Sequence, residues 1–169
     1  VDRLLEDDWD VIGIDNFAVG RKSNLGESLE NESFTLIEGD LVDKPLEEIF
    51  SGASRVFHLA ALADIVPSIE APAKYHRANV DGTVRVLEAA RAVGITRFVY
   101  AASSSCYGVP DVYPTPETAP PRPMYPYALT KWVGEQYAMH WCQTYGLPVV
   151  SLRLFNVFGP RARTTGTYG

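Results

Sequence analysis

The pair Tyr127 and Lys131 is the part of this sequence best suited to chemistry. On a helix, residues four positions apart lie on one face, so the two side chains would be neighbours. A lysine ammonium beside a phenol stabilises the phenolate, which matters because a free phenol has a pKa of about 10. The pair could therefore serve as a general acid and base. The chain has nine tyrosines, so the same spacing could also arise by chance on a surface helix.

Three consecutive serines, Ser103 to Ser105, form a second polar cluster. They follow the apolar run 97–102, which predicts a buried strand. The carboxyl edge of a parallel sheet is where open α/β folds bind ligands. A serine run alone could equally be turn chemistry. Combined with the Tyr127–Lys131 spacing, it predicts a site at the end of this strand.

Strands and helices alternate along the chain and would position these residues. We predict strands at 10–15, 34–37, 56–61, 97–102 and 149–154, and helices at 1–6, 45–50, 73–93 and 127–145. This alternation predicts an α/β fold, a doubly wound parallel sheet with helices on both faces. The segment 109–126 contains seven prolines, so we predict a loop there.

Composition narrows the class of protein. The chain has 169 residues, of which 46% are hydrophobic and 21% are charged, and a net charge of −6. The negative charge disfavours nucleic acid or an anionic membrane as the main partner. The two cysteines form no metal-ligand cluster with the three histidines, and no apolar run approaches ~20 residues. We therefore expect a cytoplasmic, metal-free globular protein.

Further motifs accompany the chemical residues. They are Asp15-Asn-Phe with Gly20-Arg-Lys, Glu38-Gly-Asp-Leu, His58-Leu-Ala-Ala, Asn79-Val-Asp-Gly-Thr, the serine run, Tyr127 to Lys131, and Arg153-Leu-Phe-Asn-Val-Phe-Gly-Pro. In this order and spacing, the set resembles the extended short-chain dehydrogenase/reductase family. Within that family it is most similar to the NAD-dependent nucleotide-sugar epimerases and dehydratases, and the resemblance covers nearly the entire chain. A Rossmann-like fold is the fold that it implies.

The resemblance implies a catalytic role for three residues. Tyr127 would remove the proton from the sugar 4-hydroxyl, Lys131 would assist it and bind the nicotinamide ribose, and Ser103 would hydrogen-bond the reacting oxygen. The implied substrate-binding residues are Ser103, Ser104, Ser105, Tyr127 and Asn156. The implied NAD-binding residues are Asp15, Asn16, Asp40, Leu41, Leu59, Ala60, Ala61, Asn79, Tyr127, Lys131 and Phe155.

Asp15 favours NAD over NADP, because a carboxylate at the end of this strand binds the ribose hydroxyls and repels a 2′-phosphate. Arg21 and Lys22 count against this, since they could pair with that phosphate. Among the other candidates, we expect His58 to be a core histidine, His76 and His140 to face solvent, and Cys106 to be buried beside the serines.

Two parts of the family pattern are not found in this sequence: the first strand with its glycine-rich turn, and the C-terminal substrate domain. We therefore expect residues 1–169 to be a partial NAD-binding Rossmann-like domain, inactive by itself, from a protein that forms homodimers. The strands at 11–14 and 56–58 would lose the neighbour that they share in such folds.

Three functions compete. The first is 4-epimerisation of a nucleotide-linked sugar of the UDP-hexose type. The second is a 4,6-dehydratase or decarboxylase of the same family, but dehydratases carry an Asp-Glu pair where this chain has Ser104 and Ser105. The third is a non-catalytic nucleotide-sugar-binding regulatory protein. Such proteins usually lose the tyrosine or the lysine, and both are present here.

Overall fold

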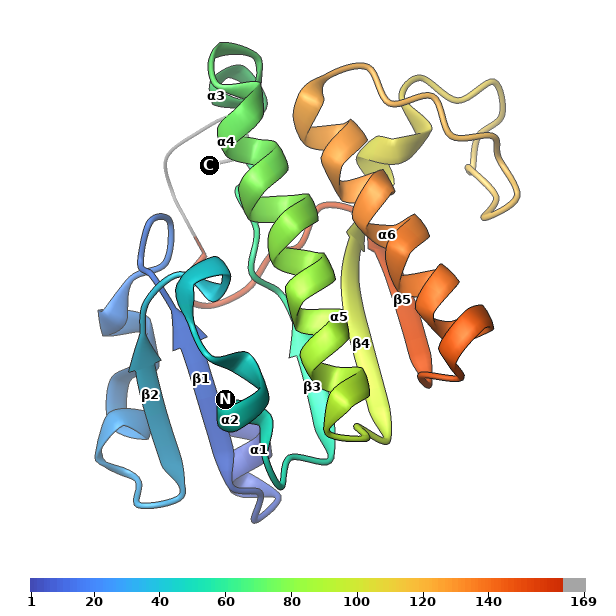
Figure 1. Cartoon of the computed structure of the whole chain (residues 1–169). Helices are drawn as coiled ribbons and strands as arrows, with labels where there is room; N and C mark the ends of the chain where they lie inside the picture. Colours follow the sequence, from blue (N-terminus) through green and yellow to red (C-terminus); the bar gives the residue numbers. More distant parts are fainter. Residues whose placement is uncertain (163–169) are drawn as a thin grey trace. The chain divides into compact units, whose positions relative to one another are not determined.

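Parallel strands form two separate sheets in the part of the chain that the structure describes, residues 1–162 (Figure 1). The computed structural model divides into two compact units, Val1–Lys44 and Pro45–Gly169. Each unit contributes its own set of the residues that the sequence singles out.

The first unit carries a two-stranded sheet. Its elements are α1 (Asp2–Glu6), β1 (Val11–Asp15), a 3-10 helix (Lys22–Glu30), β2 (Phe34–Glu38) and a second 3-10 helix (Leu41–Asp43). The strands are parallel, with Val11 opposite Phe34 and Asp15 opposite Glu38. Parallel strands end at the same edge, so the residues that follow Asp15 and Glu38 come together there.

The second unit carries a three-stranded parallel sheet in the order β3-β4-β5. Its elements are α2 (Leu46–Phe50), β3 (Arg55–His58), α3 (Ile65–Glu70), α4 (Pro72–His76), α5 (Gly82–Ala92), β4 (Arg97–Ser103), α6 (Pro126–Tyr145) and β5 (Val149–Leu154). Helices α5 and α6 lie side by side over one face of this sheet (Figure 1). Phe98, Tyr100 and Leu87 are fully buried between the sheet and these helices.

The α/β class with parallel sheets is confirmed, and so are the two long helices. The helix predicted at 73–93 is built from α4, a single π-helical turn (Arg77–Asp81) and α5, which follow one another without a break. The helix predicted at 127–145 is α6, which ends at Gly146 with a left-handed φ of 71°. The proline-rich segment 109–125 contains no helix or strand, as predicted.

The strand predicted at 56–61 is shorter in the structure, because β3 ends at His58. Beyond it, the backbone of Leu62 is bonded to a side chain and not to a neighbouring strand. Asn79 accepts a hydrogen bond from the Leu62 amide at 2.8 Å and donates one to the Leu62 carbonyl at 3.0 Å. The apolar run of the sequence therefore continues as a loop.

The edges and one face of the sheets remain open within residues 1–162. There, β1 pairs only with β2, and β3 pairs only with β4, as expected for strands that lack the neighbour they would share. Phe57 of β3 is 47% exposed. On β5, alternate residues are exposed on the face away from α5 and α6, namely Val150, Leu152 and Leu154.

Helix α6 approaches β4 closely at Gly134. A Cβ added to Gly134 would lie 2.3 Å from the Tyr100 hydroxyl and 3.2 Å from the Asn79 carbonyl oxygen. That hydroxyl donates to the Lys131 carbonyl at 3.1 Å, one turn earlier on α6. A glycine in mid-helix is unfavourable by itself, so this position is explained by the contact it permits.

We predict that Gly134→Ala destabilises the full-length protein by about 1–3 kcal/mol, despite alanine's better helix propensity, because the methyl group collides with Tyr100. Chemical denaturation measures this loss. The matched test is the same substitution in a Tyr100→Phe background, where the obstructing hydroxyl is gone and the loss should shrink. An equal loss in both backgrounds would show that the contact with Tyr100 is not the cause.

His58 is a core histidine, as predicted. Its Nε2 lies 2.9 Å from the hydroxyl of Thr83, and that hydroxyl donates to the Asn79 carbonyl at 2.6 Å. Thr83 therefore accepts from His58, which carries its proton on Nε2. Burial, with a further contribution from the positive charge of Lys131, lowers the pKa of His58 to about 3.

This lowered pKa predicts a pH dependence of stability. Below pH 6.5 an unfolded chain protonates His58, while the folded chain does not do so until about pH 3. His58 therefore reduces the free energy of unfolding as the pH falls through this window, by up to about 1.4 kcal/mol per pH unit. In His58→Gln, which keeps a hydrogen-bond donor, we expect a shallower decline in urea denaturation between pH 7 and pH 4.

The exposed His140 provides the control, and His140→Gln should leave the decline as in the wild type. A decline of the same steepness in His58→Gln would show that this histidine does not carry the effect.

Candidate active site

The end of β4 and the start of α6 bring Ser103 and Tyr127 together. Ser103 is the last residue of β4, and its Oγ accepts from the Ser105 amide at 3.2 Å, which begins a 3-10 helix (Ser104–Tyr107). The Oγ atoms of Ser103 and Ser105 are 2.7 Å apart. The Tyr127 hydroxyl donates to the Ser103 Oγ at 3.4 Å. The geometry therefore joins two of the three catalytic candidates, Tyr127 and Ser103, and brings Ser105 next to Ser103.

The first turn of α6 holds Tyr127 in place. Pro126 is the first residue of the helix, and its fixed φ suits that position. The ring of Tyr127 stacks on that of Tyr125, with centroids 6.4 Å apart. The hydroxyl of Thr130 donates to the Tyr127 carbonyl at 2.9 Å.

Lys131 is buried and its ammonium lacks a hydrogen-bond acceptor among residues 1–162. Its side chain comes from the second turn of α6, and the whole residue is only 4% exposed. Nζ lies 4.5 Å from the centroid of the Tyr100 ring, a cation–π contact. Burial lowers the pKa of Lys131 to about 8, and the negative charge of Glu135 opposes that shift. A buried ammonium with unused donors suits a ligand that offers hydroxyl or carbonyl oxygens, as a ribose does.

Asn79 connects the loop after β3 to the catalytic helix. Besides its two bonds to Leu62, its amide donates to the Thr130 hydroxyl at 3.0 Å. The side chain is almost wholly buried and these protein bonds use both of its donors. The geometry gives Asn79 a structural role, and its implied contact with NAD remains a prediction. Asn79 fixes the loop in which Leu59 and Ala60 are exposed and Ala61 is half-buried.

The first unit gathers the other predicted cofactor residues at the carboxyl ends of β1 and β2. Asp15 accepts from the Phe17 amide at 2.7 Å, and a Cβ on Gly20 would lie 2.7 Å from its other oxygen. Asn16 donates to the Asp40 carboxylate at 3.2 Å. Asp40 in turn accepts from the Val42 amide at 3.0 Å, and so starts the short helix that contains Leu41.

Lys22 is engaged within this unit. Its ammonium forms an ion pair with Glu38, the residue opposite Asp15. This pairing bears on the cofactor, because Lys22 was one of two residues that could have favoured the 2′-phosphate of NADP.

Phe155 and Asn156 follow β5 and are not joined to the other candidates by any hydrogen bond within the described residues. Phe155 is 63% exposed and Asn156 is also exposed. Their implied roles next to the nicotinamide and the diphosphate remain predictions. Cys106 is buried next to the serines as expected, and burial raises the pKa of its thiol.

Sequence reasoning missed three residues that contact the site. Tyr100 supports Lys131 from β4, Glu135 follows Lys131 by one helical turn, and Arg153 binds Glu135 with Nε at 3.0 and 3.1 Å from its two oxygens. The signal for Glu135 was its four-residue spacing from Lys131. Arg153 begins one of the motifs that carry the resemblance, but the resemblance implied no role for this residue.

The described residues contain no group of three His, Cys, Asp or Glu side chains that could hold a metal ion. No helix within them is long and apolar enough to cross a membrane.

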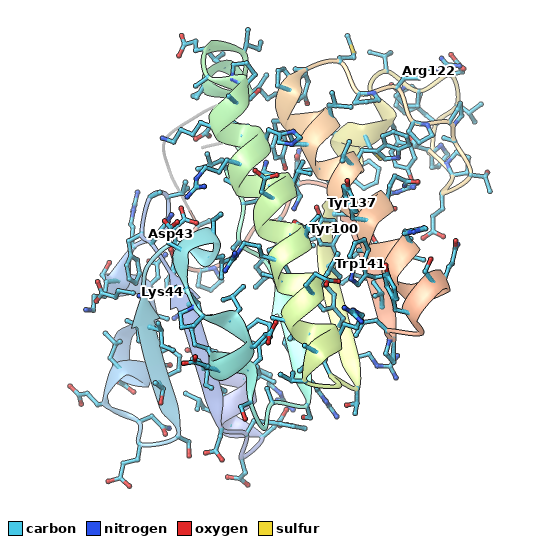
Figure 2. The ribbon with its side chains drawn as sticks, in the orientation of Figure 1. Asp43, Lys44, Tyr100, Arg122, Tyr137 and Trp141 are labelled. Atoms are coloured by element: carbon cyan, nitrogen blue, oxygen red, sulfur yellow. The ribbon has the colours of Figure 1, made fainter. Side chains whose placement is uncertain are left out.

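The two long helices pack on each other. Trp141 of α6 donates to Glu88 of α5 at 2.8 Å, near Tyr137 (Figure 2).

Comparisons with known proteins agree with this geometry. Residues 1–168 match the family described as "NAD dependent epimerase/dehydratase family". A UDP-glucose 4-epimerase of Mycolicibacterium smegmatis is 37% identical over 172 residues, which cover 100% of this chain and 55% of that protein.

Solved structures give the same result. The UDP-N-acetylglucosamine 4-epimerase of Methanobrevibacter ruminantium M1, in complex with UDP-N-acetylmuramic acid, has a TM-score of 0.94 and 38% identity, with 99% of this chain and 54% of that chain covered. A dTDP-glucose 4,6-dehydratase double mutant from Streptomyces venezuelae, with NAD bound, has a TM-score of 0.87 and 29% identity, with coverage of 94% and 52%.

The chain thus spans about half the length of the proteins that it matches. The matched range, residues 1–168, includes Ser103, Tyr127, Lys131 and the Asp15 loop, and NAD is the cofactor of the family. On this evidence, the chain belongs to the NAD-dependent epimerase/dehydratase family.

Proposed function

We propose that the whole protein is a 4-epimerase of a nucleotide-linked hexose of the UDP-sugar type, with Tyr127 as its general base and acid. The observation that carries the proposal is the hydrogen bond from Tyr127 to Ser103, next to a serine turn without a carboxylate. UDP-sugar epimerases among the relatives support the substrate class.

The residues of the second unit divide the work. Tyr127 takes the proton of the sugar 4-hydroxyl, while Ser103 donates a hydrogen bond to the same oxygen. Lys131, a buried cation, stabilises the phenolate and binds ribose hydroxyls. NAD, when bound, supplies the acceptor and then the donor of the hydride at sugar C4. Tyr127 would give the proton back to the sugar oxygen, so that the overall reaction is a redox-neutral inversion at C4.

The serines support epimerisation over dehydration. Elimination of water across C5 and C6 needs an acid and a base at those carbons. Ser104 and Ser105, which stand where dehydratases carry an Asp-Glu pair, have neutral hydroxyl groups. Ser105 is already hydrogen-bonded to Ser103. Dehydratases are among the structural relatives, so a 4,6-dehydratase or a decarboxylase is the second candidate.

In the first unit, Asp15 would bind the adenosine ribose hydroxyls, and Asn16, Asp40 and Leu41 would contact the adenosine. The ion pair of Lys22 with Glu38 supports NAD over NADP, because it draws one of the two nearby cations away from a 2′-phosphate. Leu59, Ala60 and Ala61 would let the backbone approach the cofactor, and Phe155 would lie near the nicotinamide.

A cytoplasmic location and a homodimer complete the proposal. Analytical ultracentrifugation of the full-length protein tests the dimer.

We predict that Tyr127→Phe lowers kcat at least ~100-fold in the full-length protein, because the ring survives and the proton acceptor is lost. NAD affinity, measured by calorimetry, should change by no more than a few fold. Tyr137→Phe removes a hydroxyl from an exposed position on the same helix and serves as the control, with activity near wild type. Near-normal turnover in Tyr127→Phe would remove this residue from the mechanism.

The reaction itself is tested by incubating the full-length protein with UDP-glucose, UDP-N-acetylglucosamine or UDP-glucuronate and following the sugar by NMR. We expect a product inverted at C4, with no net change in free NADH. A 4-keto-6-deoxy sugar would instead identify a dehydratase, and release of carbon dioxide a decarboxylase. Binding without any turnover would identify a regulatory protein.

A further inference from the structure

Lys131 and Glu135 form a buried pair of opposite charges on α6. They lie one helical turn apart on the same face, and they are 4% and 5% exposed. Burial is the main cause that lowers the pKa of Lys131 to about 8, and Glu135 is the group that works in the opposite direction. The charge of Lys131 therefore depends on a carboxylate that the mechanism above does not use.

Other titratable groups near Lys131 come from β3, β4 and α6 itself. From β3, His58 is neutral in the physiological range, because burial lowers its pKa to about 3. From β4, the Tyr100 ring lies under the ammonium, and burial raises the pKa of its phenol, so it too is neutral. Tyr127 precedes Lys131 on α6. Within this set, Glu135 supplies the negative charge.

Arg153 of β5 holds Glu135 in its place. Its Nε binds both carboxylate oxygens, at 3.0 and 3.1 Å, while its Nη1 donates to the Tyr107 hydroxyl at 2.8 Å and to the Glu117 carbonyl at 3.1 Å. Its guanidinium also lies 5.1 Å from the centre of the Tyr107 ring. One arginine thus joins the catalytic helix to the turn that follows the serines and to the proline-rich loop.

We propose that Glu135 is a positioning residue for Lys131: held by Arg153, its carboxylate keeps the buried ammonium charged at neutral pH and fixes its helical turn against the serine turn. The claim about the charge of Lys131 stands on the four-residue spacing of two buried side chains on α6 and on the bonds that hold Glu135. Its consequence for turnover rests on the proposed function, in which the protonated form of Lys131 is the working form.

Removing the charge of Glu135, alone or together with that of Arg153, should shift the pKa of Lys131 in a defined direction. Glu135→Gln keeps the shape of the side chain, removes the attraction, and leaves the positive charge of Arg153 without its carboxylate partner, so Lys131 should lose its proton at a lower pH. The double variant Glu135→Gln with Arg153→Gln also removes that positive charge, so its shift should be smaller. If Glu135 acted through packing alone, the pKa of Lys131 would not follow this order in the wild type and the two variants.

The experiment is an NMR titration of the lysine side chains, labelled with ¹³C and ¹⁵N, in the full-length protein without added ligand. The Lys131 signal is assigned by its absence in Lys131→Met. We expect a wild-type midpoint near 8. In Glu135→Gln the midpoint should fall by about one pH unit, as for the loss of one nearby opposite charge, and the double variant should lie between the two.

Glu88→Gln is the matched control. Glu88 is also paired with an arginine, Arg91, but it lies on α5 and has no contact with Lys131 in the described structure, so its loss should not move the midpoint. Should Glu135→Gln fail to fold, the double variant, which leaves no unpaired charge at position 153, still tests the proposal.

A Lys131 midpoint that is the same in the wild type and in the folded variants would overturn the proposal. A shift of the opposite sign would do so as well. If the full-length protein turns over a nucleotide sugar, the alkaline limb of its kcat/KM profile should move to lower pH in Glu135→Gln, in parallel with the NMR midpoint. The ordered shift without any turnover would support the role of Glu135 and count against the epimerase function.

Discussion

The close contact of α6 with β4 determines where the chemical groups of the second unit lie. Because Gly134 has no side chain, the Tyr100 hydroxyl can reach the backbone of α6 and bind the Lys131 carbonyl. This bond places the ring of Tyr100 under the Lys131 ammonium and sets the rotation of the helix. The same rotation directs Tyr127 toward Ser103 one turn earlier, and Glu135 toward Arg153 one turn later. A single backbone approach therefore serves three side-chain contacts.

Buried polar side chains connect α6 to the loops of the second unit. Asn79 lies in the π-helical turn between α4 and α5, where an extra residue changes the direction in which side chains leave the helix. From there it reaches both the loop after β3 and Thr130 on α6. Because each of these groups is buried and bonded, loss of one partner would leave another unsatisfied. The loop after β3 is thus held by the helix that carries Tyr127.

Much of this arrangement could be predicted from the sequence, because it follows from local patterns. Apolar runs identified the strands, Gly146 marked the end of α6, and the spacing of Tyr127 and Lys131 placed both on one helix. The early end of β3 could not be predicted, since the competing partner for Leu62 is Asn79, which lies 17 residues away in the sequence. The roles of Tyr100 and Arg153 also escaped prediction, because they depend on how strands and helices meet in space. Residues 163–169 lie outside the described part of the chain.

The unpaired side of β3 has a consequence for handling this polypeptide. Within residues 1–162, β3 pairs with β4 alone, so its other side could accept a further extended strand, and the exposed ring of Phe57 adds apolar surface next to it. Natural proteins protect such edges with charges, prolines or a covering strand. Residues 1–169 produced by themselves should therefore self-associate into insoluble material during expression. A strand that pairs with β3 would cover this edge and help the chain to fold.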